Sequence, residues 1–151
     1  MECQAILKLA RRLQEDEKSF RIITPYEAQR DYIELSMKAA ELSWGDTCFN
    51  VDSFQGYLSI SYHSHTQLMI IKSGNEDDYI IVSVVRNREP GFLKNWRRTN
   101  VMLTRCKKGM FIFSSKQFLT GPGAETLVGA LLNKMGGSWL MEDDINERDL
   151  F

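Results

Sequence analysis

The spacing of apolar positions along the chain predicts alternating helices and strands. Apolar residues at positions 5, 6, 9, 10 and 13 recur at the period of an amphipathic helix, whereas residues 79–85 form the continuous apolar run of a strand covered on both faces. Helices are expected at residues 2–16, 26–42, 96–106 and 124–135. Strands are expected at residues 20–23, 47–51, 79–85 and 110–114, with a last edge strand at 139–140. Thr24 is expected to cap the second helix, with Pro25 in its first turn.

Strands that alternate with helices of this length indicate an α/β fold with a largely parallel sheet between helices. We expect one domain over residues 1–140 and an acidic, frayed tail over residues 141–151. In parallel sheets the functional loops lie at the carboxyl ends of the strands. The loops after Ile23, Val51 and Val85, and the segment before Arg105, are therefore expected to cluster.

Composition narrows the class of protein. The 151 residues are 43% apolar and 26% charged, which is typical of a soluble globular domain. The apolar runs fall far short of the ~20 residues that a membrane span needs, and the first residues do not have the pattern of a secretory signal. Three widely spaced cysteines show no metal-ligand spacing and favour a reducing compartment, the cytoplasm or the nucleus.

Charge is distributed unevenly along the chain. The formal net charge is -1, but residues 86–108 contain eight basic residues and one acidic residue, Glu89. That stretch therefore carries +7, and the rest of the chain carries -8. Such a concentration indicates an anion site, for phosphate or a nucleic-acid backbone, or else a solvated helical face.

Three segments combine unusual residues in a fixed order. Residues 24–30 read TPYEAQR, residues 51–56 read VDSFQG, and residues 97–108 read RRTNVMLTRCKK, preceded by GFL at 91–93. With these motifs the chain resembles the second, C-terminal RecA-like domain of superfamily 1 helicases, in the branch that includes the helicase of nonsense-mediated mRNA decay. The resemblance covers about residues 20–118 and implies a RecA-like sheet of the P-loop NTPase type, without the phosphate loop itself.

The resemblance also implies a nucleotide site. Arg30 and Arg105 would be the γ-phosphate arginines, which meet a triphosphate at one edge of the sheet. Tyr26 would contact the base with Gln29 as a polar neighbour, and Glu76 would match the acidic residue near the ribose. The alternative for Tyr26 and Arg30 is an ordinary helix start with a surface arginine.

The same resemblance implies contacts with a single strand of RNA or DNA of any sequence. The Thr24 hydroxyl and the turn at Asp52 and Ser53 would hold phosphates at the strand ends. Arg97 and Arg98, in the basic stretch, would supply the salt-dependent part of the affinity.

The chain lacks half of the motor that the resemblance implies. The phosphate-loop pattern G-x-x-x-x-G-K-[ST] is absent, because no Gly-Lys pair occurs in the sequence. ATP and Mg²⁺ are therefore expected only together with a first RecA-like domain, in cis or in trans, and the isolated chain is expected to be inactive. Two alternatives stay open: a non-catalytic nucleic-acid-binding or protein-interaction module derived from a helicase, and a small α/β domain that binds nucleic acid passively.

Residues 57–74 interrupt the family pattern. Their removal restores FQGNEDDYIIVS, the expected continuation, so the segment is either a translated intron or a genuine surface hairpin with strands at 58–62 and 67–71. His63 and His65 lie in this segment, but it contains no Cys, Asp or Glu, which disfavours a metal site.

Overall fold

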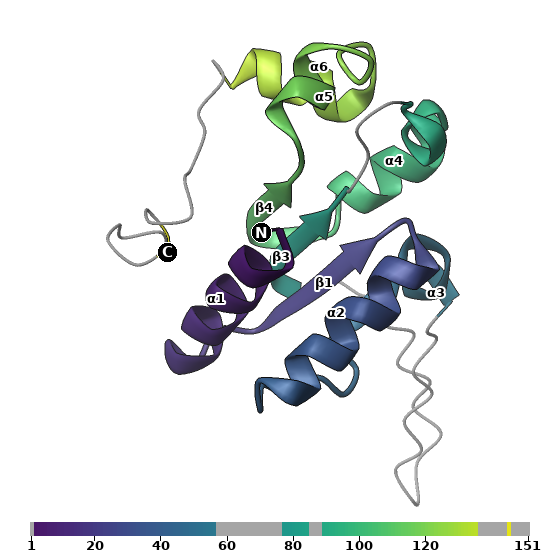
Figure 1. Ribbon diagram of the computed structural model, residues 1–151. Coiled ribbons are helices and arrows are strands. Elements are labelled where there is room, and N and C mark those ends of the chain that lie inside the picture. The colour runs from purple at the N-terminus through teal and green to yellow at the C-terminus, as the bar shows by residue number, and fades with distance from the viewer. Residues whose placement is uncertain (1, 57–76, 85–88, 136–144, 146–151) are drawn as a thin grey trace, which may run out of the picture.

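A four-stranded parallel sheet with helices on both faces forms the centre of the molecule (Figure 1). The computed structural model describes residues 2–56, 77–84, 89–135 and 145. The strands are β1 (Phe20–Thr24), β2 (Cys48–Asn50), β3 (Asp77–Ser83) and β4 (Cys106–Phe113), in the spatial order β2-β1-β3-β4. The helices are α1 (Glu2–Glu15), α2 (Glu27–Ala39), α3 (Val51–Gly56), the 3₁₀ helix η1 (Gly91–Lys94), α4 (Trp96–Leu103), α5 (Lys116–Thr120) and α6 (Leu127–Lys134). The predicted α/β RecA-like arrangement is confirmed.

The register of the central strands fixes which side chains point to which face. Ile22 of β1 is the partner of Ile81 in β3, and Ile81 is the partner of Phe111 in β4. Successive residues of a strand point to opposite faces. Because both faces of β3 are covered, Ile80, Ile81 and Val82 are all fully buried, which explains the uninterrupted apolar run in the sequence.

The first face of the sheet is covered by α1 and α2 (Figure 1). Ile6, Leu9 and Leu13 project from one side of α1 and pack with Ile22 and Ile81 in one buried cluster. The helical spacing that predicted α1 is thus the spacing of its buried stripe. On the same side of the molecule, the Arg12 guanidinium donates a hydrogen bond to the backbone carbonyl of Ile145.

The second face is covered by the helices that follow β2, β3 and β4. Phe54 of α3, Met102 of α4 and Phe118 of α5 pack with Ile80 and Val82 in a second buried cluster. The sequence predicted a turn at Asp52 and Ser53, but both residues lie in helix α3. The helix places Val51 and Phe54 on one side, where both side chains are buried against this face of the sheet. The short helix α5 was likewise not predicted.

Most element boundaries differ from the predictions by a few residues, and for two of them the physical reason is clear. Helix α2 begins at Glu27, and its N-cap residue is Tyr26, without a side-chain cap, so the prediction that Thr24 caps this helix is wrong. Strand β4 begins at Cys106, four residues earlier than predicted, because Cys106 pairs with Asp77 and Gly109 pairs with Tyr79. Lys107 and Lys108 are exposed and belong to a basic stretch, so this end of the strand lacks the apolar run by which the rest of β4 was predicted.

Gly109 allows a close approach between β4 and an aromatic ring. A Cβ atom at this position would lie 3.1 Å from Cδ1 and Cε1 of Tyr79, tighter than ordinary van der Waals contact. A side chain at Gly109 would therefore push against a ring that is buried in the first cluster.

Several predicted features lie outside the described residues: the insert at 57–74, the edge strand at 139–140 and, apart from Ile145, the tail at 141–151. Within the described part of the chain, no helix has the length and apolar character needed to cross a membrane.

The buried thiol of Cys48 gives a test of this packing. Cys48 lies in β2 with its Sγ 3.6 Å from Sδ of Met37, and burial raises the pKa of this thiol to about 12. Because the thiolate is the reactive form, alkylation of Cys48 in the folded chain is expected to be about a thousandfold slower than that of an ordinary cysteine near pH 8. Mass spectrometry after iodoacetamide treatment measures this rate, with the partly exposed Cys3 and Cys106 as internal references. In guanidinium chloride all three should react alike, and equal rates in native buffer would contradict the described burial.

Candidate functional site

The carboxyl ends of β1 and β2 bring together most of the predicted site residues. The last residues of these strands, Thr24 and Asn50, are register partners, and α2 and α3 begin within three residues of them. The residues at or near this edge of the sheet are Thr24, Tyr26, Gln29, Arg30, Asp52 and Ser53. The backbone thus brings the segments after Ile23 and Val51 to one edge, whereas residues 85–88, the start of the third expected loop, lie outside the described residues.

Arg105 lies at the opposite edge of the sheet. It immediately precedes β4, and its carbonyl accepts a hydrogen bond from the backbone N–H of Asp77, the first residue of β3 (3.4 Å). A residue that precedes a parallel strand is at the amino-terminal edge, and the seven residues of β3 separate the two edges by about 20 Å. The backbone therefore places Arg105 at the amino edge and the start of α2, which carries Arg30, at the carboxyl edge, and the convergence of the two guanidinium groups on one phosphate stays a prediction.

The surroundings of Arg105 leave its guanidinium uncompensated. Its Nε is buried and has no hydrogen-bond partner, and no carboxylate in the described part of the chain forms an ion pair with it. The two nearby acidic residues of β3 are already engaged: Asp77 with Arg21 (2.8 Å) and Asp78 with Lys108 (2.7 Å). The hydrogen bond from Lys108 holds the pKa of the Asp78 carboxyl below its usual value.

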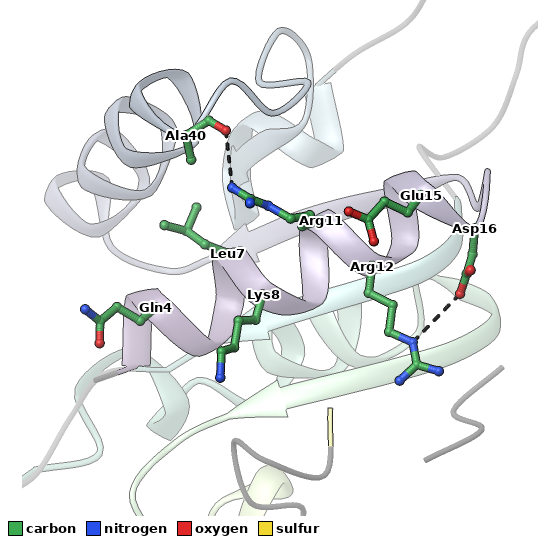
Figure 2. Close-up of a pocket in the computed structure, with 8 residues that line it drawn as sticks. All are labelled: Gln4, Leu7, Lys8, Arg11, Arg12, Glu15, Asp16 and Ala40. Carbon is green, nitrogen blue, oxygen red and sulfur yellow. Dashed lines mark hydrogen bonds and ion pairs between the residues drawn. The ribbon is translucent and has the colours of Figure 1, made fainter. Parts of the chain in front are cut away.

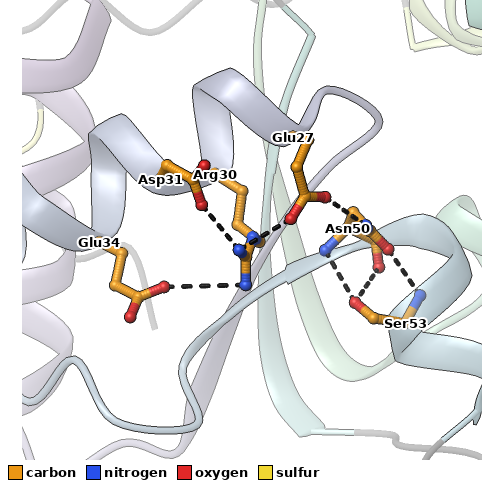
Figure 3. A network of polar contacts seen from close by, with 6 residues as sticks. All are labelled: Glu27, Arg30, Asp31, Glu34, Asn50 and Ser53. Carbon is orange, nitrogen blue, oxygen red and sulfur yellow. Dashed lines mark hydrogen bonds and ion pairs between the residues drawn. The ribbon is translucent and has the colours of Figure 1, made fainter.

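Arg30 has the opposite environment, since three carboxylates surround it (Figure 3). Its guanidinium lies 2.7 Å from Glu27, 2.6 Å from Asp31 and 3.9 Å from Glu34. Desolvation opposes the charge, but these carboxylates outweigh it and raise the pKa of Arg30 above its ordinary value. The charge of Arg30 is thus satisfied within α2, the arrangement expected of a helix-surface arginine.

Glu27 connects Arg30 to the turn between β2 and α3 (Figure 3). One of its oxygens pairs with Arg30, and the other accepts a hydrogen bond from Nδ2 of Asn50. Asn50 in turn caps α3, because its Oδ1 accepts from the Ser53 N–H (2.6 Å) while the Ser53 Oγ accepts from the Asn50 N–H (3.1 Å). This reciprocal pair is a capping box. Ser53 therefore serves the backbone of its own turn.

Asp52 and Arg98 form a two-point ion pair between α3 and α4. Arg98 Nε donates to Asp52 Oδ1 (3.1 Å), and Arg98 Nη2 pairs with the other carboxylate oxygen. The Arg98 guanidinium also lies 5.0 Å from the centre of the Phe92 ring. The Arg97 guanidinium lies over the exposed ring of Trp96, with its Cζ 5.5 Å from the ring centre.

The remaining predicted residues of this edge have local roles. Thr24 is 1% exposed, and its hydroxyl accepts a hydrogen bond from the Tyr26 N–H (3.4 Å), so the prediction that this hydroxyl faces nucleic acid is wrong. Gln29 Nε2 donates to Ser83 Oγ (3.5 Å), which donates to Glu2 at the start of α1 (3.0 Å). Glu76 lies outside the described residues.

The residues of these networks that sequence reasoning missed include Glu2, Glu27, Glu34 and Asn50. Glu27 and Glu34 stand three residues before and four after Arg30 in a predicted helix, a spacing that indicates ion pairs. Asn50 stands three residues before Ser53, a spacing typical of a helix start. No signal in the sequence connects Glu2 with Ser83.

Neither edge of the sheet contains a metal centre within the described residues, where no group of three or more His, Cys, Asp or Glu side chains could hold a metal ion. A shallow hollow of about 670 Å³ lies elsewhere, along α1 beside the end of α2 (Figure 2). It is lined by Gln4, Leu7, Lys8, Arg11, Arg12, Glu15, Asp16 and Ala40, none of which is a predicted site residue.

Removing the Asn50 cap should weaken the β2–α3 turn. The variant Asn50→Ala loses the oxygen that receives the Ser53 N–H, so the free energy of unfolding should fall by about 0.5–2 kcal/mol in urea titration. Asn50→Ser is the matched control, because it keeps a capping oxygen and loses only the amide donor to Glu27. If both variants unfold at the same urea concentration, the cap is not the stabilising part of the network.

Glu2 should make the free energy of unfolding depend on pH. Burial raises the pKa of this carboxyl, and the hydrogen bond from Ser83 opposes the rise only in part. A carboxyl whose pKa is higher in the folded state favours folding when protonated, so its contribution is lost as pH rises through the folded-state pKa. Glu2→Gln should therefore gain stability over the unmodified chain in thermal unfolding over the pH range that begins near the ordinary glutamate value of 4.5 and extends upward through the folded-state pKa. A constant difference across that range would contradict this assignment.

Comparison with known proteins extends the description. The family model described as AAA domain matches residues 1–117. Regulator of nonsense transcripts 1 of Dictyostelium discoideum is 36% identical over 122 residues, which cover 75% of this chain and 8% of that protein. ATP-dependent helicase NAM7 of Saccharomyces cerevisiae is 34% identical over 127 residues, which cover 79% of this chain and 11% of that protein.

An uncharacterised ATP-dependent helicase of Methanocaldococcus jannaschii is 29% identical over 119 residues, which cover 78% of this chain and 15% of that protein. The chain thus spans between 8 and 15% of the length of these relatives. The family match includes the whole sheet, from α1 through β4 to the start of α5. This chain therefore belongs to the AAA domain family, as a helicase-like domain similar to those of the superfamily 1 helicases of nonsense-mediated decay.

Proposed function

We propose that this chain is the second motor domain of an ATP-dependent superfamily 1 helicase. Relatives from three organisms carry the name ATP-dependent helicase or regulator of nonsense transcripts, and each is far longer than this chain. A first RecA-like domain, in cis or in trans, would supply the phosphate loop that the sequence lacks. In that assembly ATP and Mg²⁺ are held by the first domain, inside the cell, where three free thiols stay reduced.

The observation that carries the proposal is the uncompensated guanidinium of Arg105. A buried N–H without an acceptor costs about 1–3 kcal/mol, which an incoming anion recovers. Phosphoryl transfer depends on positive charge placed against the γ-phosphate, and the planar guanidinium binds phosphate oxygens at two points. Arg105 is therefore proposed as the arginine that this domain places against the γ-phosphate of an ATP molecule bound by the first RecA-like domain.

Arg30 is not proposed as a second arginine on the same phosphate. It lies near the carboxyl edge of the sheet and is already satisfied by three carboxylates, whereas Arg105 lies at the amino edge. Tyr26 and Gln29, which adjoin Arg30, remain candidates for contact with a nucleotide only if the first domain reaches that edge.

The proposed nucleic-acid contacts lie on α3 and α4. Arg97 is exposed and pairs with no carboxylate in the described part of the chain, so it is free to meet a phosphate. Arg98 is bound to Asp52, and these exposed partners would share their ion pair with an incoming phosphate at little cost, since such pairs contribute at most about 1 kcal/mol. ATP-driven closure of the two domains would then move this surface along a single strand.

A second candidate function is a non-catalytic nucleic-acid-binding module. It is favoured by the same exposed cations, which need no nucleotide to bind a phosphate backbone. The two functions differ in one respect: only the motor requires Arg105.

Mixing this chain with a first RecA-like domain should produce ATP hydrolysis that neither part shows alone. In the mixture, Arg105→Ala should lower kcat by about 10³–10⁵, because the charge on the transferring phosphoryl group is no longer stabilised. Phosphate release, measured at saturating ATP and single-stranded RNA, gives this rate.

The matched control is Lys107→Ala, which removes an exposed charge two residues further along the chain. Arg105→Lys should recover only part of the rate, since a lysine keeps the charge but lacks the two-point geometry. Full activity of the Arg105→Ala mixture would rule out the motor and leave the passive module.

A further inference from the structure

Trp96 is a large aromatic side chain that the fold leaves in solvent. It is the first residue of α4 and is 62% exposed, although burial of an indole ring is strongly favourable. The helix start does not require it, because the cap is made by Asn95, whose side chain accepts the Arg98 N–H. The exposed indole therefore has no structural task that the described residues reveal.

The surroundings of Trp96 are positively charged. The Arg97 guanidinium lies 5.5 Å from the centre of the Trp96 ring, and the exposed Lys94 precedes it by two residues. Residues 90–108 contain six basic residues and no acidic one. Asp52 of α3 forms an ion pair with Arg98 of α4, which neutralises its charge.

Trp96 also shares its side of α4 with a polar group. Asn100 follows one helical turn later, is exposed, and lies on the same side of α4. The Asp52–Arg98 pair fastens α4, the helix that begins with Trp96, to α3. An aromatic ring, cations and an amide donor thus share one surface.

We infer that Trp96 is a stacking platform for an unpaired base of single-stranded nucleic acid, with Arg97 and Lys94 holding the adjoining phosphates. The inference rests on the proposed function, because the strand is the one that the motor would move. An indole accepts any base on its face, and a flanking guanidinium adds a cation–π contact and a phosphate partner. The platform is therefore indifferent to sequence. The shared chemistry of RNA and DNA, a base and a phosphate, is what it recognises.

The test uses the full chain alone, without nucleotide, and oligomers of about ten uridines or ten thymidines. Trp96→Ala should weaken binding of both oligomers by roughly 5- to 150-fold, and Trp96→Phe should retain most of the affinity. Binding should quench indole fluorescence, and the part of the quenching that depends on stacking should disappear in Trp96→Ala.

Trp44→Ala is the matched control. Trp44 is also exposed and also lies beside a cation, with Lys38 5.1 Å from its ring, but it follows α2 on the other face of the sheet. Its removal should leave the affinity unchanged. The salt dependence separates the two kinds of contact: Arg97→Ala should lower the slope of log affinity against log salt by about 1, whereas Trp96→Ala should leave it unchanged.

The outcomes separate this inference from the function on which it rests. If the unmodified chain binds neither oligomer, the nucleic-acid contacts of the proposed function fail together with the platform. If it binds both and Trp96→Ala binds as tightly as Trp44→Ala, the platform alone is overturned and the ring belongs to a protein contact. Loss of affinity for one oligomer only would support the platform and identify the sugar that it prefers.

Discussion

The parallel register of the sheet is the constraint on which the rest of the structure depends. Every described pair of neighbouring strands runs in the same direction, so each residue that follows a strand belongs to one edge and each residue that precedes a strand belongs to the other. The helices must then return along both faces, which buries two separate clusters of side chains on the two sides of β1 and β3. The positions of all the chemically interesting residues follow from this one arrangement.

The two arginines singled out in the sequence show how strongly position decides electrostatic state. Arg30 lies one helical turn from Glu27 and from Glu34, and these carboxylates balance its charge within one helix. Arg105, at the start of β4, finds the neighbouring carboxylates already bound to Arg21 and Lys108. The Nε atoms of Arg30 and Arg105 are both buried without a hydrogen-bond partner, so the carboxylates make the difference. A phosphate approaching Arg30 would have to displace them, whereas no carboxylate of the described residues pairs with Arg105. Identical side chains thus differ in their readiness to bind an anion.

Most of the architecture could be predicted from the sequence, because it depends on local periodicity. The stripe of Ile6, Leu9 and Leu13 and the run around Ile81 each carry their own signal, and strands alternating with helices imply parallel pairing. The start of β4 could not be predicted in this way, since its first residues become a strand only by pairing with β3. The edges at which the two arginines lie follow from topology alone: Arg105 precedes β4 whether that strand begins at residue 106 or at residue 110, whereas Arg30 follows β1. The side-chain contacts of Arg30 with Glu27 and Glu34, and of Asp77 with Arg21, depend on how the elements pack and could not be predicted from strand order.

Glu27 joins parts of the chain that the sheet alone would leave independent. Its two oxygens contact Arg30 on α2 and Asn50 at the end of β2, and Asn50 is bound in turn to the first turn of α3. Helix α2, the tip of β2 and helix α3 are therefore linked by side chains as well as by backbone. With the Asp52–Arg98 pair, this chain of side-chain contacts runs from α2 through α3 to α4 along the surface of the molecule, outside both buried clusters.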